Sequence, residues 1–282
     1  MNKKIVIRDR ITNEEKEFKS YGELAKFFNV DQRRVSDWVN KVRVSLCMRE
    51  YDRKYTYELI PVCNYNYFRV WSPEMAYFLG LIYADGNVKT QVSDTKNGNA
   101  FKHYVRISSI DRDVIEVFKK EINSDHKIQK QEKKQGKFIY VLEVGGDDMY
   151  QSMLDLGIEE SKTYKDCEVK LNPDYEDYFW TGYIDGDGSV TNDGKYLRIE
   201  VLFCAHNVKM IKRFEDWLTR LGIGINKEII FREELNATVE VFSYRIQRDL
   251  DMEILLNHTY LKSKVKINRK FNKIKKYRRL LP

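Results

Sequence analysis

Two aspartates in this chain stand at equivalent places in similar stretches of sequence. Asp85 ends the apolar run FLGLIYAD and Asp187 ends the run YFWTGYIDGD, and a glycine follows each of them directly. Carboxylate oxygens are the ligands that Mg²⁺ and other hard divalent cations prefer. Two carboxylates at one point could therefore hold metal ions for the hydrolysis of a phosphodiester. For that chemistry the chain must bring the two side chains together.

Both runs have the pattern of helices that pack closely on a partner. Small residues recur four positions apart in each run: Gly80 and Ala84, then Gly182 and Gly186. A glycine inside a helix costs about 1 kcal/mol relative to alanine, so such a row indicates a helix whose backbone contacts another backbone. We expect the two helices to pack along these rows, with both aspartates side by side at the C-terminal ends.

Two carboxylates at the ends of adjacent helices repel each other, and the negative ends of the helix dipoles add to the repulsion. Bound divalent cations offset this cost. The arrangement therefore predicts a metal site at Asp85 and Asp187, with Gly86 and Gly188 beside them. The alternative is a pair of ordinary buried helices that end in glycine caps. A single copy leaves that alternative open, and the second copy makes it the weaker interpretation.

The segments FLGLIYADG and WTGYIDGDG resemble the two motifs of single-chain LAGLIDADG homing endonucleases. In that family the penultimate acid of each motif binds metal and is catalytic, and Asp85 and Asp187 occupy those positions here. The first motif departs from the family at Tyr83, where an aspartate is usual and where the second motif has Asp185. The resemblance implies a monomeric endonuclease that uses Mg²⁺ or Mn²⁺ to cut a long, asymmetric double-stranded DNA site with short 3′ overhangs.

The order of predicted elements repeats after each motif. Each motif helix is followed by two strands, a helix, two more strands and a closing helix, which indicates an α+β fold. The resemblance implies a duplicated αββαββα saddle with pseudo-two-fold symmetry, whose two sheets line a DNA groove. The predicted divisions are 1–60 for a small helix-turn-helix module, 61–71 for a linker, 72–170 for the first half, and 171–282 for the second half with a basic C-terminal tail.

The N-terminal segment has the pattern of a helix-turn-helix behind a short hairpin. Residues 3–19 alternate loosely, as a hairpin does. Ser20 with Glu23 forms a capping box for a first helix, and Asp31 can cap a second one. A helical hairpin without DNA affinity is the alternative. Residues 43–69, which are rich in tyrosine and basic residues, predict one or two strands and then a linker.

DNA contacts are predicted on the outward faces of the strands, on the second N-terminal helix and in the basic tail. Successive strand residues point to opposite faces, so only alternate positions can face a groove. The candidates are Lys89, Gln91, Arg106, Lys127, Gln129, Lys137, Arg198, Lys227, Arg232 and Arg245 on or near strands, Gln32, Arg33 and Ser36 on the helix, and Lys262 and Lys264 in the tail. The alternative for each is a solvated side chain without a partner.

Composition limits the possible classes. The net charge is +7 over 282 residues, and residues 262–279 contain ten basic side chains and no acid. The middle of the chain is acidic on average, so a DNA-binding saddle must gather its positive side chains on one face. The four cysteines lack metal-ligand spacing and suit a reducing compartment, such as a bacterial or phage-infected cytoplasm or an organellar matrix. No apolar run is long enough to span a bilayer.

We therefore predict a site-specific, metal-dependent, double-strand DNA endonuclease, encoded by a mobile intron, an intein or a free-standing gene. Two other classes stay open. One is an RNA maturase that binds intron RNA and assists its splicing, and the other is a catalytically inactive DNA-binding regulator. Members of the family often keep a lysine near each metal. The stretches SKTYK (161–165) and KSKVKINRKF (262–271) follow the last helix of each half, but the sequence does not place that lysine.

Overall fold

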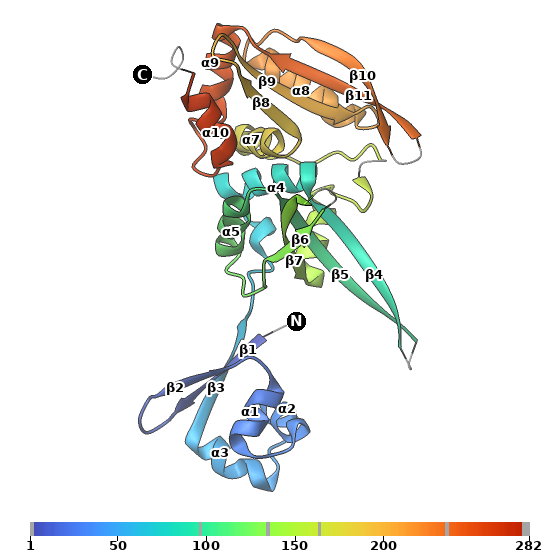
Figure 1. Cartoon of the computed structure of the whole chain (residues 1–282). Coiled ribbons are helices and arrows are strands. Elements are labelled where there is room, and N and C mark those ends of the chain that lie inside the picture. Colours follow the sequence, from blue (N-terminus) through green and yellow to red (C-terminus); the bar gives the residue numbers. More distant parts are fainter. Residues whose placement is uncertain (1–2, 96–97, 134–135, 163–164, 235–236, 278–282) are drawn as a thin grey trace. The chain divides into compact units, whose positions relative to one another are not determined.

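The computed structural model describes residues 3–95, 98–133, 136–162, 165–234 and 237–277 (Figure 1). The chain forms two compact units. Met1–Asn64 with Asn123–Asp125 make the first, which we call the small unit, and Tyr65–Ile122 with His126–Pro282 make the second, the large unit. No helix in the described ranges has the length and apolar character needed to cross a bilayer.

The small unit has a three-stranded antiparallel sheet in the order β2-β1-β3 beside three short helices. Its elements are β1 (Lys3–Asp9), β2 (Glu15–Phe18), α1 (Tyr21–Phe28), α2 (Gln32–Val39), α3 (Arg49–Lys54) and β3 (Tyr55–Pro61). Ser20 caps α1 by accepting the Glu23 N–H, and Asp31 caps α2 by accepting the Arg33 N–H, as predicted. The tyrosine-rich segment differs from the prediction, because α3 precedes its one long strand.

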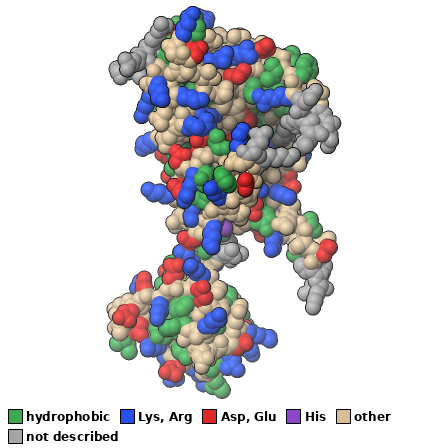
Figure 2. Space-filling model, in the orientation of Figure 1, with side chains coloured by type: hydrophobic (Ala, Val, Ile, Leu, Met, Phe, Trp, Pro, Cys, Tyr) green, Lys and Arg blue, Asp and Glu red, His purple; other side chains and the backbone are tan. Residues whose placement is uncertain are grey.

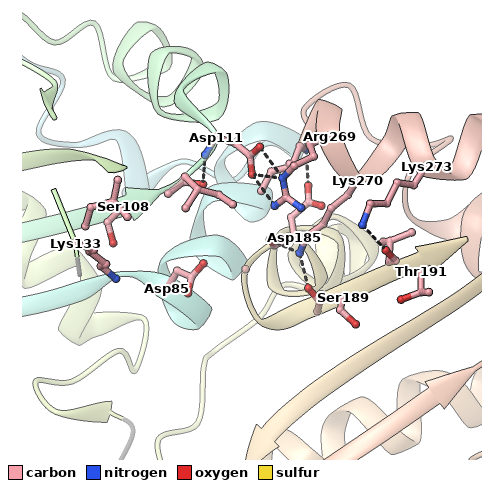
Figure 3. A pocket seen from close by; sticks show the side chains of 17 residues that line it. Asp85, Ser108, Asp111, Lys133, Asp185, Ser189, Thr191, Arg269, Lys270 and Lys273 are labelled. Carbon is pink, nitrogen blue, oxygen red and sulfur yellow. Dashed lines mark hydrogen bonds and ion pairs between the residues drawn. The ribbon is translucent and has the colours of Figure 1, made fainter. Parts of the chain in front are cut away.

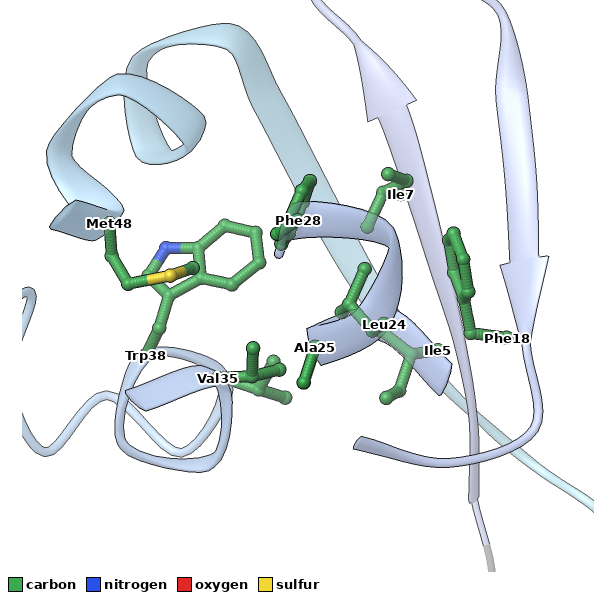
Figure 4. Packing of buried hydrophobic residues seen from close by; sticks show 10 residues of the cluster. Ile5, Ile7, Phe18, Leu24, Ala25, Phe28, Val35, Trp38 and Met48 are labelled. Atoms are coloured by element: carbon green, nitrogen blue, oxygen red, sulfur yellow. The ribbon is translucent and has the colours of Figure 1, made fainter. Parts of the chain in front are cut away.

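The core of the small unit joins the sheet to the two capped helices. Ile5 and Ile7 from β1 meet Phe28 from α1 and Trp38 from α2 (Figure 4). The Trp38 side chain is fixed by its indole N–H, which donates to Asp52 Oδ1 over 2.7 Å. The sheet, α1 and α2 all contribute to this one cluster. The two helices are therefore packed together against the sheet as a pair.

The large unit repeats one order of elements, which gives the predicted α+β duplication. The first half consists of α4 (Pro73–Asp85), β4 (Asn87–Thr95), β5 (Gly98–Ser109), α5 (Arg112–Glu121), β6 (Gln129–Glu132), β7 (Phe138–Gly145) and α6 (Asp147–Asp155). Its sheet has the order β4-β5-β7-β6. Five residues before the start of α4, Phe68 is buried against Phe118 of α5, so part of the predicted linker belongs to this core.

The second half consists of α7 (Glu176–Asp187), β8 (Gly188–Asn192), β9 (Leu197–Cys204), α8 (Val208–Arg220), β10 (Lys227–Glu234), β11 (Ala237–Ile246) and α9 (Asp249–His258), and its sheet has the order β10-β11-β9-β8. A further helix follows, α10 (Asn268–Lys275), inside the segment predicted as a basic tail. Residues 278–282 of that tail lie outside the described ranges. Within the described ranges, the halves thus share seven elements and differ at α10.

Each sheet of the large unit has one face covered by helices. In the second half, Phe203 of β9 and Tyr244 of β11 pack on Phe214 of α8, with ring centroids 5.1 and 5.3 Å from it. In the first half, Val105 and Ile107 of β5 are buried on the corresponding face. Figure 1 shows α4 and α7 at the centre of the large unit, with one sheet on either side of the pair.

Candidate functional site

The two motif helices, α4 and α7, are in direct backbone contact. A Cβ atom added to Gly80 would lie 2.0 Å from the carbonyl oxygen of Phe179, and one added to Gly182 would lie 1.9 Å from that of Tyr77. Such distances are far inside van der Waals contact, so only glycine allows this approach at either position. One turn further on, a Cβ on Gly186 would lie 2.3 Å from that of Ala84. The predicted rows of small residues therefore form the interface.

This packing brings the predicted carboxylates to one end of the helix pair. The Asp85 carboxylate lies beside the α7 backbone, with its Oδ2 atom 3.5 Å from the place of a Cβ on Gly186. Burial, and after it the neighbouring charge of Asp85, raise the pKa of Asp187 to about 6. Loss of solvent around Asp85 raises its pKa as well, although the side chain stays open on one side. Burial and mutual repulsion therefore make ionisation of this pair energetically costly.

Two lysines that the sequence left unassigned hold the ends of these helices. Lys162 donates from Nζ to the carbonyl oxygens of Gly86 (2.8 Å) and Ala84 (3.4 Å). Lys270 donates to the carbonyl oxygen of Gly188 (2.6 Å) and to two further carbonyls at the end of α7. Desolvation lowers the pKa of both amines, while the nearby aspartates oppose that shift. Each helix end thus carries one lysine beside one aspartate.

These contacts change the expected role of the two glycines. Gly86 and Gly188 were predicted at the metal site, but their carbonyl oxygens accept hydrogen bonds from lysine ammonium groups. A second cation on the same oxygen would meet a positive charge directly, so we leave both out of the ligand set. The reason for glycine is space. A Cβ on Gly86 would lie 2.7 Å from the Ile82 backbone, and one on Gly188 would lie 2.4 Å from the Ile184 carbonyl oxygen.

Asp185, the acid that the first motif lacks, is buried, and its carboxylate accepts three hydrogen bonds. It accepts hydrogen bonds of 2.7 Å from the hydroxyls of Tyr77 and Tyr260 and from the backbone N–H of Ile267. Burial raises its pKa, and the charge of Lys270 and these donors oppose the shift. Because Ile267 directly precedes α10, this carboxylate anchors α10 against the motif helix. These contacts give Asp185 a structural role.

Helix α10 forms one wall of a pocket of about 400 Å³ beside Asp85 (Figure 3). Arg269 makes a two-point ion pair with Asp111 at the start of α5, with N···O distances of 2.9 and 3.0 Å. The helix therefore links the second half to the first across the pocket. Its polar lining joins acids, hydroxyls and amines: Asp85, Asp111, Asp185, Ser108, Ser109, Ser189, Thr191, Lys133, Arg269, Lys270 and Lys273.

The strand register separates the sequence-predicted DNA contacts by face. In the first half Lys89, Gln91 and Arg106 share the face opposite the helices, since Arg106 pairs with Asn87 while buried Val105 pairs with Val88. Gln129 is on the same face, because it pairs with Val141 opposite Ser108. In the second half the outward residues are Arg198, Arg232 and Arg245. Lys127 and Lys137 are exposed next to the strands.

Two predicted DNA contacts lie elsewhere. Lys227 is opposite Tyr244 in the register, so it is on the helix side of its sheet, where it pairs with Glu215 at 3.1 Å. Lys262 donates to Asp177 over 2.6 Å, in the first turn of α7 and therefore at the end far from Asp187. We therefore no longer count Lys227 and Lys262 among the candidate DNA contacts. Lys264 is exposed and stays a candidate.

In the small unit, Gln32 and Arg33 are exposed on α2 and Ser36 is half-buried. The Ser36 hydroxyl accepts a 3.2 Å hydrogen bond from the Asn40 amide. On the face seen in Figure 2, basic side chains are interspersed with acidic ones on both units. The charge on that face is therefore mixed, and a positive DNA-binding surface would have to be local.

Within the described residues, no three His, Cys, Asp or Glu side chains gather as a metal site. The aspartate pair is thus not a closed cage. Two carboxylates supply hard oxygen ligands, and their mutual repulsion favours a cation between or beside them. The donor set fits Mg²⁺ or Mn²⁺, which are commonly held by one or two carboxylates together with water and substrate phosphates.

No protein-family profile and no curated protein matches this sequence. Solved structures do match. The LAGLIDADG homing endonuclease I-GzeII in complex with its DNA target is 13% identical, with a TM-score of 0.50 over 74% of this chain and 89% of that chain. The meganuclease I-SmaMI bound to uncleavable DNA is 13% identical, with a TM-score of 0.47 over 73% and 88%. I-LtrWI bound to target DNA is also 13% identical, with a TM-score of 0.47 over 76% and 89%. The I-GzeII match, together with the duplicated element order, gives this chain the LAGLIDADG homing endonuclease fold.

Proposed function

We propose that this protein is a site-specific DNA endonuclease that cuts both strands with divalent metal ions, Mg²⁺ or Mn²⁺, held by Asp85 and Asp187. One observation carries the proposal. The absence of side chains at Gly80 and Gly182 allows the two motif helices to pack backbone to backbone. This packing places the carboxylates of Asp85 and Asp187 close together, where they repel each other. A fold that needed only stability would not keep that repulsion. The carboxylates are useful where a cation and a phosphate complete the site.

When bound, the divalent ions supply Lewis-acid stabilisation of the charge that develops on the scissile phosphate. Asp85 and Asp187 would hold them from two sides of the helix interface. Lys162 and Lys270 place one positive charge at each helix end, where they bind backbone carbonyls and offset the negative ends of both dipoles. One lysine and one aspartate on each side match the two strands of a duplex, so two cuts would follow from one site.

The outward faces of the two sheets would bind the duplex. Residues such as Arg106 and Gln129 in the first half, and Arg198 and Arg245 in the second, lie on those faces. Arginine and glutamine are suited to hydrogen bonds with base edges in the major groove. Arg245 is held by Glu200 at 3.0 Å, which fixes the direction of its guanidinium group. A fixed side chain discriminates between bases better than a mobile one.

The small unit would extend the DNA contact. Its α1 and α2 form a rigid pair with Gln32 and Arg33 exposed, as a helix-turn-helix requires of its second helix. Deletion of residues 1–60 should weaken binding to the target several-fold without moving the cut, because both aspartates lie in the large unit. A shifted cut position would contradict this division of roles.

The proposal is tested by incubating the purified full chain with a randomised and a host-derived duplex library. One reaction contains Mg²⁺ and a parallel one contains chelator, and cut ends are recovered by sequencing. We expect cutting at one long site that requires the metal. As a control for substitutions at Asp85 and Asp187, Asp174→Asn changes an exposed acid in the turn that precedes α7 and should cut like the unchanged protein.

Two results would favour the other classes. Specific binding of one duplex without metal-dependent cutting would indicate a DNA-binding regulator. No preference for any duplex, together with specific binding of structured intron RNA that accelerates splicing, would indicate a maturase. In either case the aspartate pair would need another explanation.

A further inference from the structure

Lys162 is carried by a short segment between α6 and α7, and a neighbouring carboxylate ties that segment to the first sheet. We infer that Glu160 is a positioning residue that couples the β4–β5 hairpin, one of the surfaces proposed to contact DNA, to Lys162 at the cleavage site. This inference rests on the proposed endonuclease function. It adds that one of the two lysines is held in place by the DNA-contacting hairpin itself.

Three side chains lie around the Glu160 carboxylate: Thr90, Tyr150 and His103. The Thr90 hydroxyl of β4 donates to Glu160 Oε1, and the Tyr150 hydroxyl of α6 donates to the same oxygen over 2.9 Å. Thr90 is also 3.0 Å from Nδ1 of His103 on β5, whose ring packs on that of Tyr150 at a centroid distance of 4.3 Å. Glu160 is half-buried. Its carboxylate thus joins strand β4 to helix α6, and His103 of β5 contacts both of its donors.

Glu160 can transmit its position to Lys162 because little freedom lies between them. Ile158 is fully buried and its N–H donates to the Met153 carbonyl oxygen, which fixes the segment before Glu160. Ser161, the single residue between Glu160 and Lys162, has a left-handed backbone with φ of 56°. Lys162 then reaches the Gly86 carbonyl at 2.8 Å. Release of Glu160 should therefore loosen the lysine that caps α4.

Thr90 also connects this tie to the outward face of the sheet. It lies between Lys89 and Gln91, and in a strand these neighbours point to the opposite face. Duplex contacts by these two side chains would fix the strand that carries Thr90. Binding at the hairpin and placement of Lys162 would then be coupled through one hydrogen-bonded carboxylate.

The second half holds its own lysine in a different way. Lys270 is part of α10, which Asp185 anchors through the Ile267 N–H. Loss of Glu160 should therefore affect the side of the site that Lys162 serves and leave the side of Lys270 nearly unchanged. This asymmetry separates a positioning role from a general structural one, which would affect both strands.

The test follows each strand of the selected target with its own 5′ label, under single-turnover conditions with Mg²⁺. Glu160→Ala should slow the cutting of one strand about tenfold or more, so that nicked duplex accumulates. The slowed strand should be the one that Lys162→Met slows. Glu160→Gln keeps an oxygen acceptor for both hydroxyls and should restore most of the rate. Glu159→Ala is the matched control, since Glu159 is exposed and pairs only with Lys165 at 2.9 Å among the contacts described for it.

Thr90→Val provides a second variant with the same expected strand bias, and its effect should not add to that of Glu160→Ala. Binding measured in chelator and thermal melting identify variants that fail to fold. Equal slowing of both strands, an unchanged rate in Glu160→Ala, or additive effects of the two changes would overturn the inference. Absence of cutting by the unchanged protein would instead refute the proposed function.

Discussion

The two halves of the large unit place the same chemistry with different supports. Asp85 and Asp187 end equivalent helices, and Lys162 and Lys270 bind the carbonyls at those ends. The first lysine belongs to a short segment tied to the sheet, whereas the second belongs to α10. Duplication thus preserved the contacts at the helix ends, while the structures that hold them diverged.

The helix interface is the most symmetric part of this comparison, and it should show the largest effect on stability. Gly80→Ala and Gly182→Ala each place a Cβ about 2 Å from a backbone oxygen of the other helix. Alanine favours an isolated helix by about 1 kcal/mol, but here each change should lower stability by about 3 kcal/mol because the helices must separate.

Thermal melting of the two variants checks this prediction, with Gly224→Ala as the control. A Cβ on Gly224 would make ordinary contacts, the nearest at 3.5 Å to Arg248. The melting temperatures of Gly80→Ala and Gly182→Ala should fall by similar amounts. A stabilised variant, or a large difference between the two, would show that the helix pair is not packed in this way.

The first motif has Tyr83 where the second has Asp185, and substitutions at these two residues should lower stability by unequal amounts. Asp185→Asn removes the charge beside Lys270 and leaves one of three buried donors without an acceptor, which should cost about 2 kcal/mol. Tyr83→Phe removes one hydrogen bond of 3.3 Å to the Cys167 carbonyl and should cost about 1 kcal/mol. Limited proteolysis with mass detection would show whether α10 opens in Asp185→Asn. Equal costs, or a protected α10, would contradict the anchoring role.

Substitution of Asp187 should have a smaller effect on stability than the glycine substitutions above, and at neutral pH it should stabilise the protein. The pKa of Asp187 is raised to about 6 from an ordinary value of 3.8, so the folded protein binds this proton more tightly than the unfolded chain does. This group therefore favours folding below about pH 4, and that contribution is lost as the pH rises through 6. At neutral pH the cost of ionisation is at most about 3 kcal/mol.

Asp187→Asn removes that cost, so in chelator the variant should melt above the unchanged protein at pH 7.5. The gap should shrink at pH 5, where the unchanged carboxyl is largely protonated. Mg²⁺ should raise the melting temperature of the unchanged protein more than that of the variant. A variant that melts lower at both pH values would mean that Asp187 stabilises the fold.

Part of this architecture could be predicted from the sequence, because it depends on local or repeated signals. The repeated apolar run identified Asp85 and Asp187, and capping residues such as Ser20 and Asp31 marked the starts of helices. The element order of both halves followed from hydrophobic periodicity. The saddle itself came from the resemblance, which the I-GzeII match supports at the level of the fold.

The remaining features depend on contacts between distant residues. Lys270 could not be distinguished among ten basic side chains in its segment, although Ile267, Phe271 and Ile274 have the spacing of a helix. The face of Lys227 was unclear because Ile229, Ile230 and Phe231 are all apolar, so β10 lacks the alternation that fixes a register.

The most direct test of the account measures cleavage and binding by Asp85→Asn and Asp187→Asn on the selected target. Removal even of groups that only support metal ligands costs 10- to 100-fold in comparable sites, so each variant should lose more than about 100-fold in cutting. Binding to the same duplex in chelator should stay within a few-fold of the unchanged protein, because both acids lie outside the outward faces of the sheets. Undiminished cutting by either variant, or loss of binding together with cutting, would contradict the claim that this aspartate pair is the metal site of a DNA endonuclease.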